Sequence, residues 1–532
     1  MTHGPDPGPP HRVVVVGHGM AGARLVEELL GRGGHASGRP LHLSVVGTEP
    51  YGGYNRVLLS EVVAGRADVA GLAMSDPAGL AAGGVDVRLG TSALAVDRAA
   101  RVVRLDDGTH VPYDSCVLAT GASPIVPPLR GVDPAAPPTG VHTLRDLDDA
   151  RAIVAAAANT RRAVVLGGGL LGLEAARGLA SRGLDVVVLH AAPHVMERQL
   201  DAAGGAVLAR RLGRLGVRVR TGALTVAATS RAGRLTGLEL DDGSVVPADL
   251  LVVAIGARPR TGLAERAGLA VGRGVLVDDT LTTSDPDILA IGDCAEHRGE
   301  CSGLVAPAWE QARVVADRLT GTDPDAAYTG HRPVTRLKAA DLDVAALGTA
   351  LVDPWEAEDA GLEVVQLLDA ARGRYVKAVL RDGVVVGAIS IGEPRAAAEL
   401  TLLAERGSPA PRDRAVLLLP GLRAATDVSD APTLIPDRAT VCRCNGVTKG
   451  SIVAAWTAGA RTVEDVTAAT RAATGCGTCR ATVDGILCWL TDADPEPAPD
   501  GAGIPAPTPA AGTDPAATIP ARAAAVIEGA AR

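Results

Sequence analysis

This chain contains the same pattern of strand, glycine-rich turn and helix twice, with about 150 residues between the two copies. The first copy begins with "RVVVV" (12–16) and the second with "RAVVL" (162–166), and each continues into GxGxxG and a helical pattern. A continuous β-branched run predicts a parallel strand that is buried on both faces. The glycines allow a tight turn and a close approach to a pyrophosphate, which binds at the helix N-terminus. The six glycines are Gly17, Gly19 and Gly22 in the first loop, and Gly167, Gly169 and Gly172 in the second. The repeat predicts two dinucleotide-binding units in one chain.

The residue after the second strand of each unit bears on which nucleotide binds. Glu49 in "VVGTEP" has the position of an acid that holds an adenosine ribose. In the second unit His190 in "VVVLHAAP" stands where an acid would mark NAD. A 2′-phosphate would prefer a basic residue there, and Arg198 is within possible reach. The choice between NADH and NADPH therefore stays open.

Composition excludes several other classes of protein. The chain has 532 residues and a net charge of −9, which gives no bulk attraction to nucleic acid or to an anionic membrane. No apolar run approaches the roughly 18 residues that span a bilayer, and the N-terminus lacks a signal-peptide pattern. We therefore expect a cytoplasmic protein without nucleic-acid or membrane partners. At about 100–200 residues per domain, the length predicts three to five domains.

Three further segments each end a predicted strand at a glycine. They are "SCVLATGASP" (115–124), "DLLVVAIGARP" (249–259) and "TTSDPDILAIGDCAE" (282–296). Each segment alone is typical of an ordinary strand exit. Together with the two loops, they make residues 12–410 resemble the pyridine-nucleotide-dependent flavin reductases, which have two dinucleotide-binding domains.

That resemblance implies FAD at the first loop and NAD(P)H at the second. It implies that Asp293 hydrogen-bonds the FAD ribityl chain and that Glu174 lies near the nicotinamide. "APAWEQA" (306–312) would run beside the flavin ring. The other positions that it assigns to cofactor binding are Thr120, Gly121, Gly256 and Gly292. The helix after the first loop has no CxxxxC, so a disulfide reductase of the glutathione-reductase type is not expected, and Cys294 is predicted to be buried.

A more specific resemblance lies in "YGGYNRVLLSEVVAG" (51–65) and "HVMERQLD" (194–201). Both are similar to segments of the assimilatory nitrite reductase large subunit and of nitrate reductase electron-transfer subunits. Arg56 of the first segment is assigned, with Glu174, to catalysis and cofactor binding. Rubredoxin and ferredoxin reductases usually place a Lys after the Ser of this segment, near the flavin N5, and here that residue is Glu61. The polar partner of N5 therefore stays open.

Four cysteines form two tight pairs near the C-terminus, with 31 residues between the pairs. A C-x-C pair is a poor fit to a zinc ribbon, which uses two C-x₂₋₄-C knuckles. A redox disulfide at the C-x-x-C pair would leave the other pair unexplained. Four thiolates suit a [2Fe–2S] cluster, with zinc and a disulfide as alternatives. The four cysteines are Cys442, Cys444, Cys476 and Cys479.

The neighbourhood of these cysteines resembles the bacterioferritin-associated-ferredoxin-like [2Fe–2S] domain. In "GVTKGSI" and "TVEDV", Thr448 and Thr462 are predicted helix N-caps. Cys488, on the apolar helix "GILCWL", is predicted to lie in the core.

The predicted fold class is α/β, with two Rossmann-like domains, an α+β interface domain and a small helical [2Fe–2S] domain. In the α+β domain Asp382-Gly383 predicts a hairpin turn. The predicted segments are a disordered N-terminus (1–11), the FAD domain in two parts (12–135 and 257–328), the NAD(P)H domain (136–256), the α+β domain (329–410), a linker (411–437), the cluster domain (438–490) and a disordered Ala/Pro-rich tail (491–532).

We therefore expect an NAD(P)H-dependent FAD oxidoreductase that passes electrons through a [2Fe–2S] cluster to a separate protein. The expected acceptor is the catalytic subunit of assimilatory nitrate or nitrite reduction. A full nitrite reductase large subunit carries a further sirohaem domain with more cysteines, and only Cys488 follows Cys479 here. The alternatives are a reductase for another ferredoxin-like protein or oxygenase, and a non-catalytic redox sensor.

Overall fold

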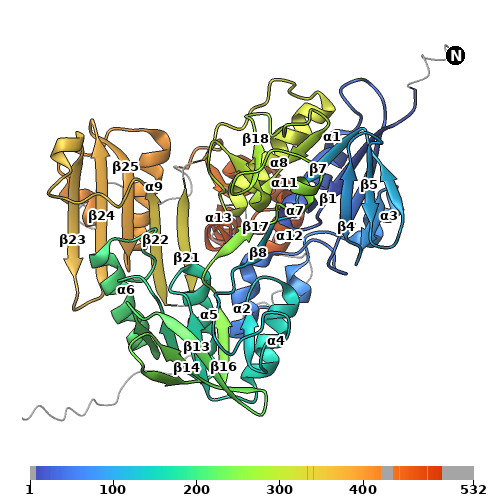
Figure 1. Cartoon of the computed structure of the whole chain (residues 1–532). Coiled ribbons are helices and arrows are strands. Elements are labelled where there is room, and N and C mark those ends of the chain that lie inside the picture. Colours follow the sequence, from blue (N-terminus) through green and yellow to red (C-terminus); the bar gives the residue numbers. More distant parts are fainter. Residues whose placement is uncertain are drawn as a thin grey trace, which may run out of the picture.

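The computed structural model describes residues 8–331, 333–339, 341–420, 435–442, 444–475, 477 and 479–493. The predicted ligand Cys476 and most of the predicted tail lie outside these ranges. Figure 1 shows a β-sheet at one side of the molecule, two units with the strand–turn–helix pattern beside it, and a helical module behind. Among the described residues, no helix is long and apolar enough to cross a membrane.

The first unit is built on a five-stranded parallel sheet in the order β19-β7-β1-β2-β3. Its strands are β1 (His11–Val16), β2 (Leu41–Gly47), β3 (Asp86–Leu89), β7 (Ser115–Leu118) and β19 (Ile288–Ala290). Val13, Val14 and Val15 are fully buried, as expected of a central strand covered on both faces. Helices α1 (Met20–Arg32) and α8 (Val305–Thr320) pack on one face. On the other face lies an antiparallel sheet of β4 (Ala93–Asp97), β5 (Val102–Leu105) and β6 (His110–Pro112).

The chain leaves the first unit after β7 and returns to it after β16 (Leu250–Val253). The two crossings run side by side, because β8 (Ala122–Pro124) pairs antiparallel with β17 (Ala257–Pro259). The shorter elements of the first unit are η1 (Arg56–Leu58), α2 (Leu59–Ala64), η2 (Ala70–Leu72), α3 (Pro77–Ala82), α7 (Gly262–Arg266), β18 (Val275–Val277), η3 (Gly292–Cys294) and β20 (Ala295–His297). The second unit therefore interrupts the first.

The second unit repeats the architecture with a parallel sheet in the order β12-β11-β10-β16-β9. Its elements are β9 (Val141–Thr143), α4 (Leu147–Ala157), β10 (Arg162–Leu166), α5 (Leu170–Ser181), β11 (Asp185–Leu189), α6 (Ala202–Arg214), β12 (Val217–Arg220) and β16 (Leu250–Val253), with an antiparallel sheet of β13 (Thr225–Arg231), β14 (Arg234–Leu240) and β15 (Val245–Pro247). Helix α2 of the first unit packs on α5, so the two units share a hydrophobic core.

The third sheet is antiparallel, in the order β21-β22-β25-β24-β23. Its elements are β21 (Val334–Ala339), β22 (Leu342–Gly348), η4 (Glu358–Ala360), β23 (Glu363–Asp369), β24 (Arg374–Arg381), β25 (Val384–Ile391), α9 (Pro394–Arg406) and α10 (Ala415–Leu418). The predicted hairpin turn is confirmed, since Asp382 and Gly383 join β24 to β25 with positive φ values of 50° and 75°. Strand β21 was not predicted, because its polar "TRLK" stretch gives a weak strand pattern.

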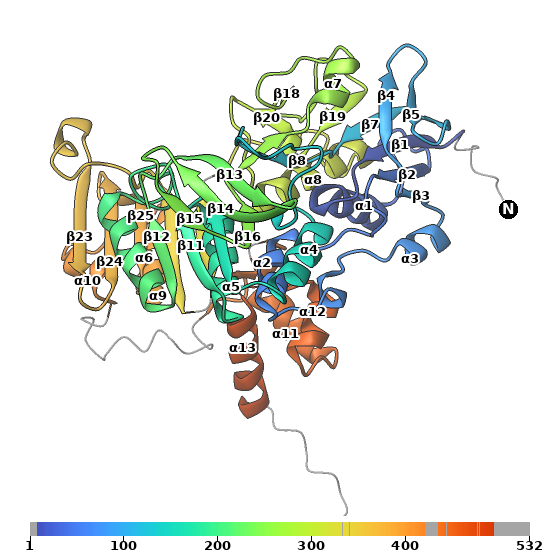
Figure 2. The ribbon, with the colours of Figure 1, turned by 60° about the horizontal axis from the view of Figure 1, so that its bottom comes forward.

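The cluster module contains β26 (Thr440–Cys442), β27 (Val447–Thr448), α11 (Lys449–Thr457), α12 (Val463–Thr470) and α13 (Arg480–Ala493). The N-caps are confirmed, since the hydroxyl groups of Thr448 and Thr462 accept hydrogen bonds from backbone N–H groups of α11 and α12. The core prediction for Cys488 is wrong: the residue is exposed on α13, whose buried stripe is Val483, Ile486, Leu487 and Leu490. Helix α13 projects away from the rest of the molecule (Figure 2). It continues three residues into the segment predicted as a disordered tail.

Candidate functional site

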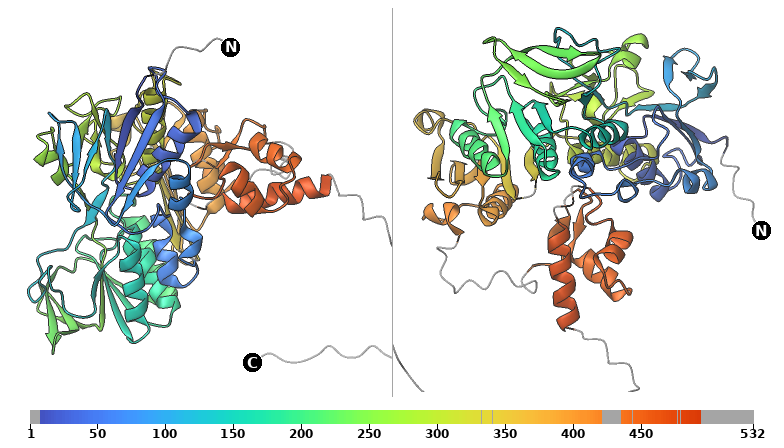
Figure 3. Two further views of the ribbon diagram at one scale, coloured as in Figure 1. Left: turned by 90° about the vertical axis from the view of Figure 1, so that its right-hand side faces the viewer. Right: turned by 90° about the horizontal axis from the view of Figure 1, so that it is seen from below.

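A cavity of about 1680 Å³ lies between the first unit, α5 of the second unit and the cluster module. Most of the predicted site residues line it: Gly17, Gly19, Glu49, Arg56, Thr120, Gly121, Glu174, Gly292, Asp293, Cys442, Cys444 and Cys479. The predicted glycines that do not line it are Gly22, Gly167, Gly169, Gly172 and Gly256. Figure 3 shows the cluster module against the side of the first unit, which explains how cysteines far along the chain reach this wall.

The two glycine loops have the same construction. Gly17 has φ +115°, and a Cβ there would lie 2.1 Å from the carbonyl oxygen of Ala119. Gly167 has φ +120°, and its Cβ would lie 2.3 Å from the carbonyl oxygen of Ala254. The third glycines, Gly22 and Gly172, would place a Cβ 1.9 Å and 2.1 Å from the carbonyl oxygen of the first glycine of the same loop. Only glycine therefore allows each helix to start this close to its strand.

The middle glycines begin the helices. Gly19 is the N-cap of α1 and Gly169 the N-cap of α5, and neither helix has a side-chain cap. The first N–H groups of each helix therefore stay available for an anionic group. Gly19 lines the cavity, so the N-terminus of α1 faces it.

Glu49 is held by two neighbours on the cavity wall. It forms an ion pair with Arg56, and the Tyr54 hydroxyl donates a hydrogen bond of 2.6 Å to its Oε2. The Arg56 guanidinium also lies over the Tyr54 ring, 4.9 Å from the centroid. The "YNR" segment thus places the positive charge of Arg56 beside Gly19 and holds the Glu49 carboxylate next to that charge.

Sequence reasoning missed two arginines of this wall, Arg145 and Arg260. Arg145 forms an ion pair with Asp293, and its Nε donates a hydrogen bond of 3.1 Å to the carbonyl oxygen of Ala122. Burial, and then the charges of Arg56 and Arg145, lower the pKa of Arg260. Arg56 lies beside the N-terminus of α1, and Arg145 and Arg260 line the same cavity, so these guanidinium groups fit the diphosphate of a dinucleotide. A signal was available for Arg260, which directly follows the predicted segment "DLLVVAIGARP" (249–259), whereas no predicted segment adjoins Arg145.

Glu174 connects the two units at the cavity. It is on α5, only 8 % exposed, and its Oε2 accepts a hydrogen bond of 2.9 Å from the hydroxyl of Ser60 on α2. The next residue, Glu61, points elsewhere: its carboxylate binds Arg66 at 2.7 and 3.0 Å and does not line the cavity. Glu61 is therefore not a cavity substitute for the Lys of rubredoxin and ferredoxin reductases.

At the second loop His190 supplies a structural link rather than a basic charge. The Gly168 N–H donates to its Nδ1 at 3.1 Å, so the ring proton is on Nε2. That Nε2 lies 2.9 Å from Oε2 of Glu197 and donates to it. An acid therefore lies beside this loop after all, seven positions after His190 in the chain.

The cysteines of the cluster module are partly buried at the cavity wall. Cys442 and Cys479 are 2 % and 8 % exposed. A hydrogen bond with the Cys479 thiol, assisted by the backbone N–H groups of Ala473 and Asn445, lowers the pKa of Cys442 to about 6. Thiolates are the form that binds metals, so this donor set fits a cluster. Within the described ranges, which omit Cys476, no three His, Cys, Asp or Glu side chains form a metal-binding group.

Three family models match successive parts of this chain. Residues 11–314 match the pyridine nucleotide-disulphide oxidoreductase model. The chain belongs to this family. Residues 333–407 match the rubredoxin NAD⁺ reductase C-terminal domain, and residues 440–489 match the BFD-like [2Fe-2S] binding domain. The cofactors are therefore FAD and a [2Fe–2S] cluster, with NAD(P)H as the nucleotide, in an oxidoreductase of mixed α/β fold.

Known proteins of this oxidoreductase family resemble the chain over most of its length. Nitrite reductase [NAD(P)H] of Bacillus subtilis is 36 % identical over 90 % of this chain and 57 % of its own length. The assimilatory nitrate reductase electron transfer subunit of the same organism is 33 % identical over 91 % of this chain and 60 % of its own length. The chain thus spans less than two thirds of these relatives. A putidaredoxin reductase–putidaredoxin complex, solved as a crystal structure, matches 75 % of this chain and 94 % of its own with a TM-score of 0.66 at 27 % identity.

Proposed function

We propose that this protein oxidises NAD(P)H at FAD and passes the electrons through its [2Fe–2S] cluster to a separate acceptor protein. The observation that carries the proposal is that the first glycine loop and Cys442, Cys444 and Cys479 line the same cavity. A flavin accepts two electrons as a hydride and releases them singly, which suits a one-electron cluster. With both sites on one cavity, the protein would convert between a two-electron and a one-electron carrier.

The predicted site residues and the two further arginines would contact different parts of FAD and NAD(P)H. We assign Gly17, Gly19, Thr120, Gly121 and Gly292 to backbone contacts with FAD. Arg56, Arg145 and Arg260 would neutralise its diphosphate, Glu49 would bind its adenosine ribose, and Asp293 its ribityl chain. Gly167, Gly169, Gly172 and Gly256 would shape the NAD(P)H site. Glu174, held by Ser60, would orient the nicotinamide from the side of the second unit.

The acceptor that we favour is the catalytic subunit of a nitrate or nitrite reductase. The support is the similarity to a nitrite reductase and to a nitrate reductase electron transfer subunit. A ferredoxin-like acceptor is the second candidate, because the first unit, second unit and third sheet resemble a reductase solved in complex with putidaredoxin. We place the activity in the cytoplasm, where NAD(P)H is abundant and thiols stay reduced.

The test uses the full chain loaded with FAD, iron and sulfide. NADH or NADPH should reduce the flavin in stopped-flow absorbance and then the cluster in electron paramagnetic resonance. Cys442→Ser should keep flavin reduction by the nucleotide and lose electron delivery to the acceptor protein. Cys488→Ser is the matched control, because this exposed cysteine lies in the same module and should change neither step.

Two results would contradict the proposal. Undiminished delivery to the acceptor by Cys442→Ser would remove the cluster from the path. Stoichiometric zinc without iron in the purified protein would reject the cluster itself, and no turnover with either nucleotide would favour a sensor.

A further inference from the structure

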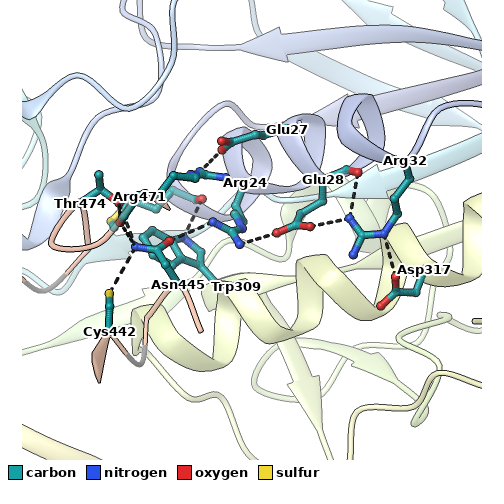
Figure 4. Close-up of polar contacts among 11 residues, drawn as sticks. Arg24, Glu27, Glu28, Arg32, Trp309, Asp317, Cys442, Asn445, Arg471 and Thr474 are labelled. Carbon is teal, nitrogen blue, oxygen red and sulfur yellow. Dashed lines mark hydrogen bonds and ion pairs between the residues drawn. The ribbon is translucent and has the colours of Figure 1, made fainter. Parts of the chain in front are cut away.

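The cluster module is fastened to the first unit through a buried arginine. Arg24 is on α1, in the turn after the glycine loop, and its side chain is only 7 % exposed. Its Nη1 donates a hydrogen bond of 3.0 Å to Oδ1 of Asn445, in the turn between β26 and β27 (Figure 4). This contact joins residues that are 421 positions apart in the chain.

The positive charge of Arg24 is built into a ladder along α1. Glu28 pairs with Arg24 on one side and with Arg32 on the other, and Arg32 continues to Asp317 on α8 at 2.7 Å (Figure 4). The Arg24 guanidinium also lies over the ring of Trp309, 5.4 Å from its centroid, and this tryptophan is fully buried. The ladder holds Arg24 in one place and keeps its Nη1 aimed at Asn445 of the module.

Arg24 on the oxygen side, and the Arg471 carbonyl and Thr474 hydroxyl on the nitrogen side, together fix which way the Asn445 amide faces. A guanidinium offers donors only, so the amide atom that meets it must be the oxygen. The Asn445 Nδ2 is therefore turned toward the cluster site, 3.7 Å from the sulfur of Cys442. The same Nδ2 lies 2.6 Å from the carbonyl oxygen of Arg471 and 2.9 Å from Oγ1 of Thr474.

Other contacts dock the module without touching Cys442. Asn55 of the "YNR" segment donates to the carbonyl oxygens of Thr474 and Gly475 at 2.9 and 2.6 Å. Arg471 forms an ion pair with Glu27. Arg24 differs from Asn55 and from the Glu27–Arg471 ion pair because its side chain bonds the Asn445 amide, which lies next to the Cys442 sulfur.

We propose that Arg24 is a positioning residue for the cluster: by orienting Asn445 it aims an N–H group at the sulfur of Cys442 and so raises the reduction potential of the cluster. Hydrogen bonds to the sulfurs stabilise the extra negative charge of the reduced form, which is one of the ways in which proteins set such potentials. The inference rests on the proposed function, because it assigns a residue that tunes the electron exit of that path.

The test is the midpoint potential of the cluster, measured by redox titration followed by electron paramagnetic resonance in the loaded full-length protein. Arg24→Met removes the donors, and Asn445→Ala removes the amide, so each should give a more negative midpoint. Arg24→Lys keeps a charged donor and should retain most of the wild-type potential. If Arg24→Met does not retain its cluster, Arg24→Lys and Asn445→Ala still give the comparison, and a midpoint unchanged in Asn445→Ala would overturn the inference.

The double variant Arg24→Met/Asn445→Ala distinguishes an effect of Arg24 through Asn445 from a direct effect of the Arg24 charge on the potential. If Arg24 acts through Asn445, the double variant should shift the potential by clearly less than the sum of the two single shifts. Additive shifts would mean that the charge acts through space, which would overturn the positioning role. Arg12→Gln is the matched control, since Arg12 lies in the same unit and pairs with Asp114, outside both the ladder and the described contacts of the module, and its potential should equal that of the wild type.

The outcomes also distinguish this inference from the proposed function. A wild-type protein that takes up zinc instead of iron would contradict both. A loaded protein whose cluster is reduced by NAD(P)H, but whose potential is the same in Arg24→Met and Asn445→Ala, would contradict only the role of Arg24.

Discussion

The hydroxyl of Ser60 donates a hydrogen bond of 2.9 Å to the carboxylate of Glu174, and this bond joins α2 of the first unit to α5 of the second at the cavity wall. Both residues are buried, with exposed fractions of 1 % and 8 %. The bond fixes the carboxylate relative to the flavin side of the cavity, although the two residues come from different units.

Ser60→Ala should slow the reduction of the flavin by NAD(P)H. Losing one hydrogen bond to a buried carboxylate costs about 1.5 kcal/mol or more, which is roughly tenfold in rate if the bond orients Glu174 for hydride transfer. Stopped-flow absorbance of the flavin measures the rate directly. Ser181→Ala is a control, because Ser181 lies at the end of the same helix as Glu174 and its hydroxyl donates to the Gly178 carbonyl outside the cavity. Equal rates in Ser60→Ala and wild type would contradict the orienting role.

Arg260→Gln and Arg145→Gln should weaken FAD binding. A charged hydrogen bond to an anion contributes about 1.5–3 kcal/mol, so each change should raise the FAD dissociation constant roughly tenfold or more. Quenching of FAD fluorescence by apoprotein measures the constant. The matched control is Arg66→Gln, whose guanidinium binds Glu61 outside the cavity. An unchanged constant in both cavity variants would show that the three-arginine wall does not bind the diphosphate.

Glu197→Ser should shift nucleotide preference toward NADPH. The Glu197 carboxylate lies beside the second glycine loop, 2.9 Å from the His190 ring, and would repel a 2′-phosphate. At about 1.4 kcal/mol, removing this repulsion changes the ratio of kcat/KM for NADPH over NADH roughly tenfold. Glu239→Ser, on β14 of the same unit, is the control and should leave the ratio alone. An unchanged ratio in Glu197→Ser would show that another residue sets the preference between NADPH and NADH.

The stability of the first unit should fall as the pH decreases below 6.5. Burial lowers the pKa of His18, in the first glycine loop, to about 4 from 6.5. The unfolded chain therefore binds a proton that the folded chain rejects, so stability is complete above pH 6.5 and decreases down to about pH 4. Between pH 7.5 and pH 5 the loss from this group is about 2 kcal/mol.

His18→Asn should lose less stability over the same interval, because the amide does not titrate. The urea concentration that releases FAD, followed by flavin fluorescence at both pH values, gives the comparison. The carboxylates and other histidines affect both proteins alike, so their contribution cancels. Parallel decreases in the two proteins would rule out His18 as a source of the pH dependence.

Local patterns were enough to predict the elements that hold the nucleotides. The β-branched runs at 12–16 and 162–166 became central strands, and the first and third glycines of each following loop met backbone too closely for any Cβ. Strand period, turn glycines and N-cap residues act within a few residues of each other, so a sequence displays them directly. The spacing of the cysteines likewise predicted a cluster site. The apolar pattern "GILCWL" misplaced Cys488, because burial depends on which helix face meets the module core.

Only the tertiary structure decided how these parts combine. Arg145 and Arg260 meet Arg56 because two crossings between units run side by side, and Asn445 meets Arg24 because the module docks on α1. Such contacts depend on the positions of elements hundreds of residues apart, and no local preference encodes them. The chain therefore showed in its motifs which cofactors it binds, whereas the packing of its units determines which charges and hydrogen bonds surround them.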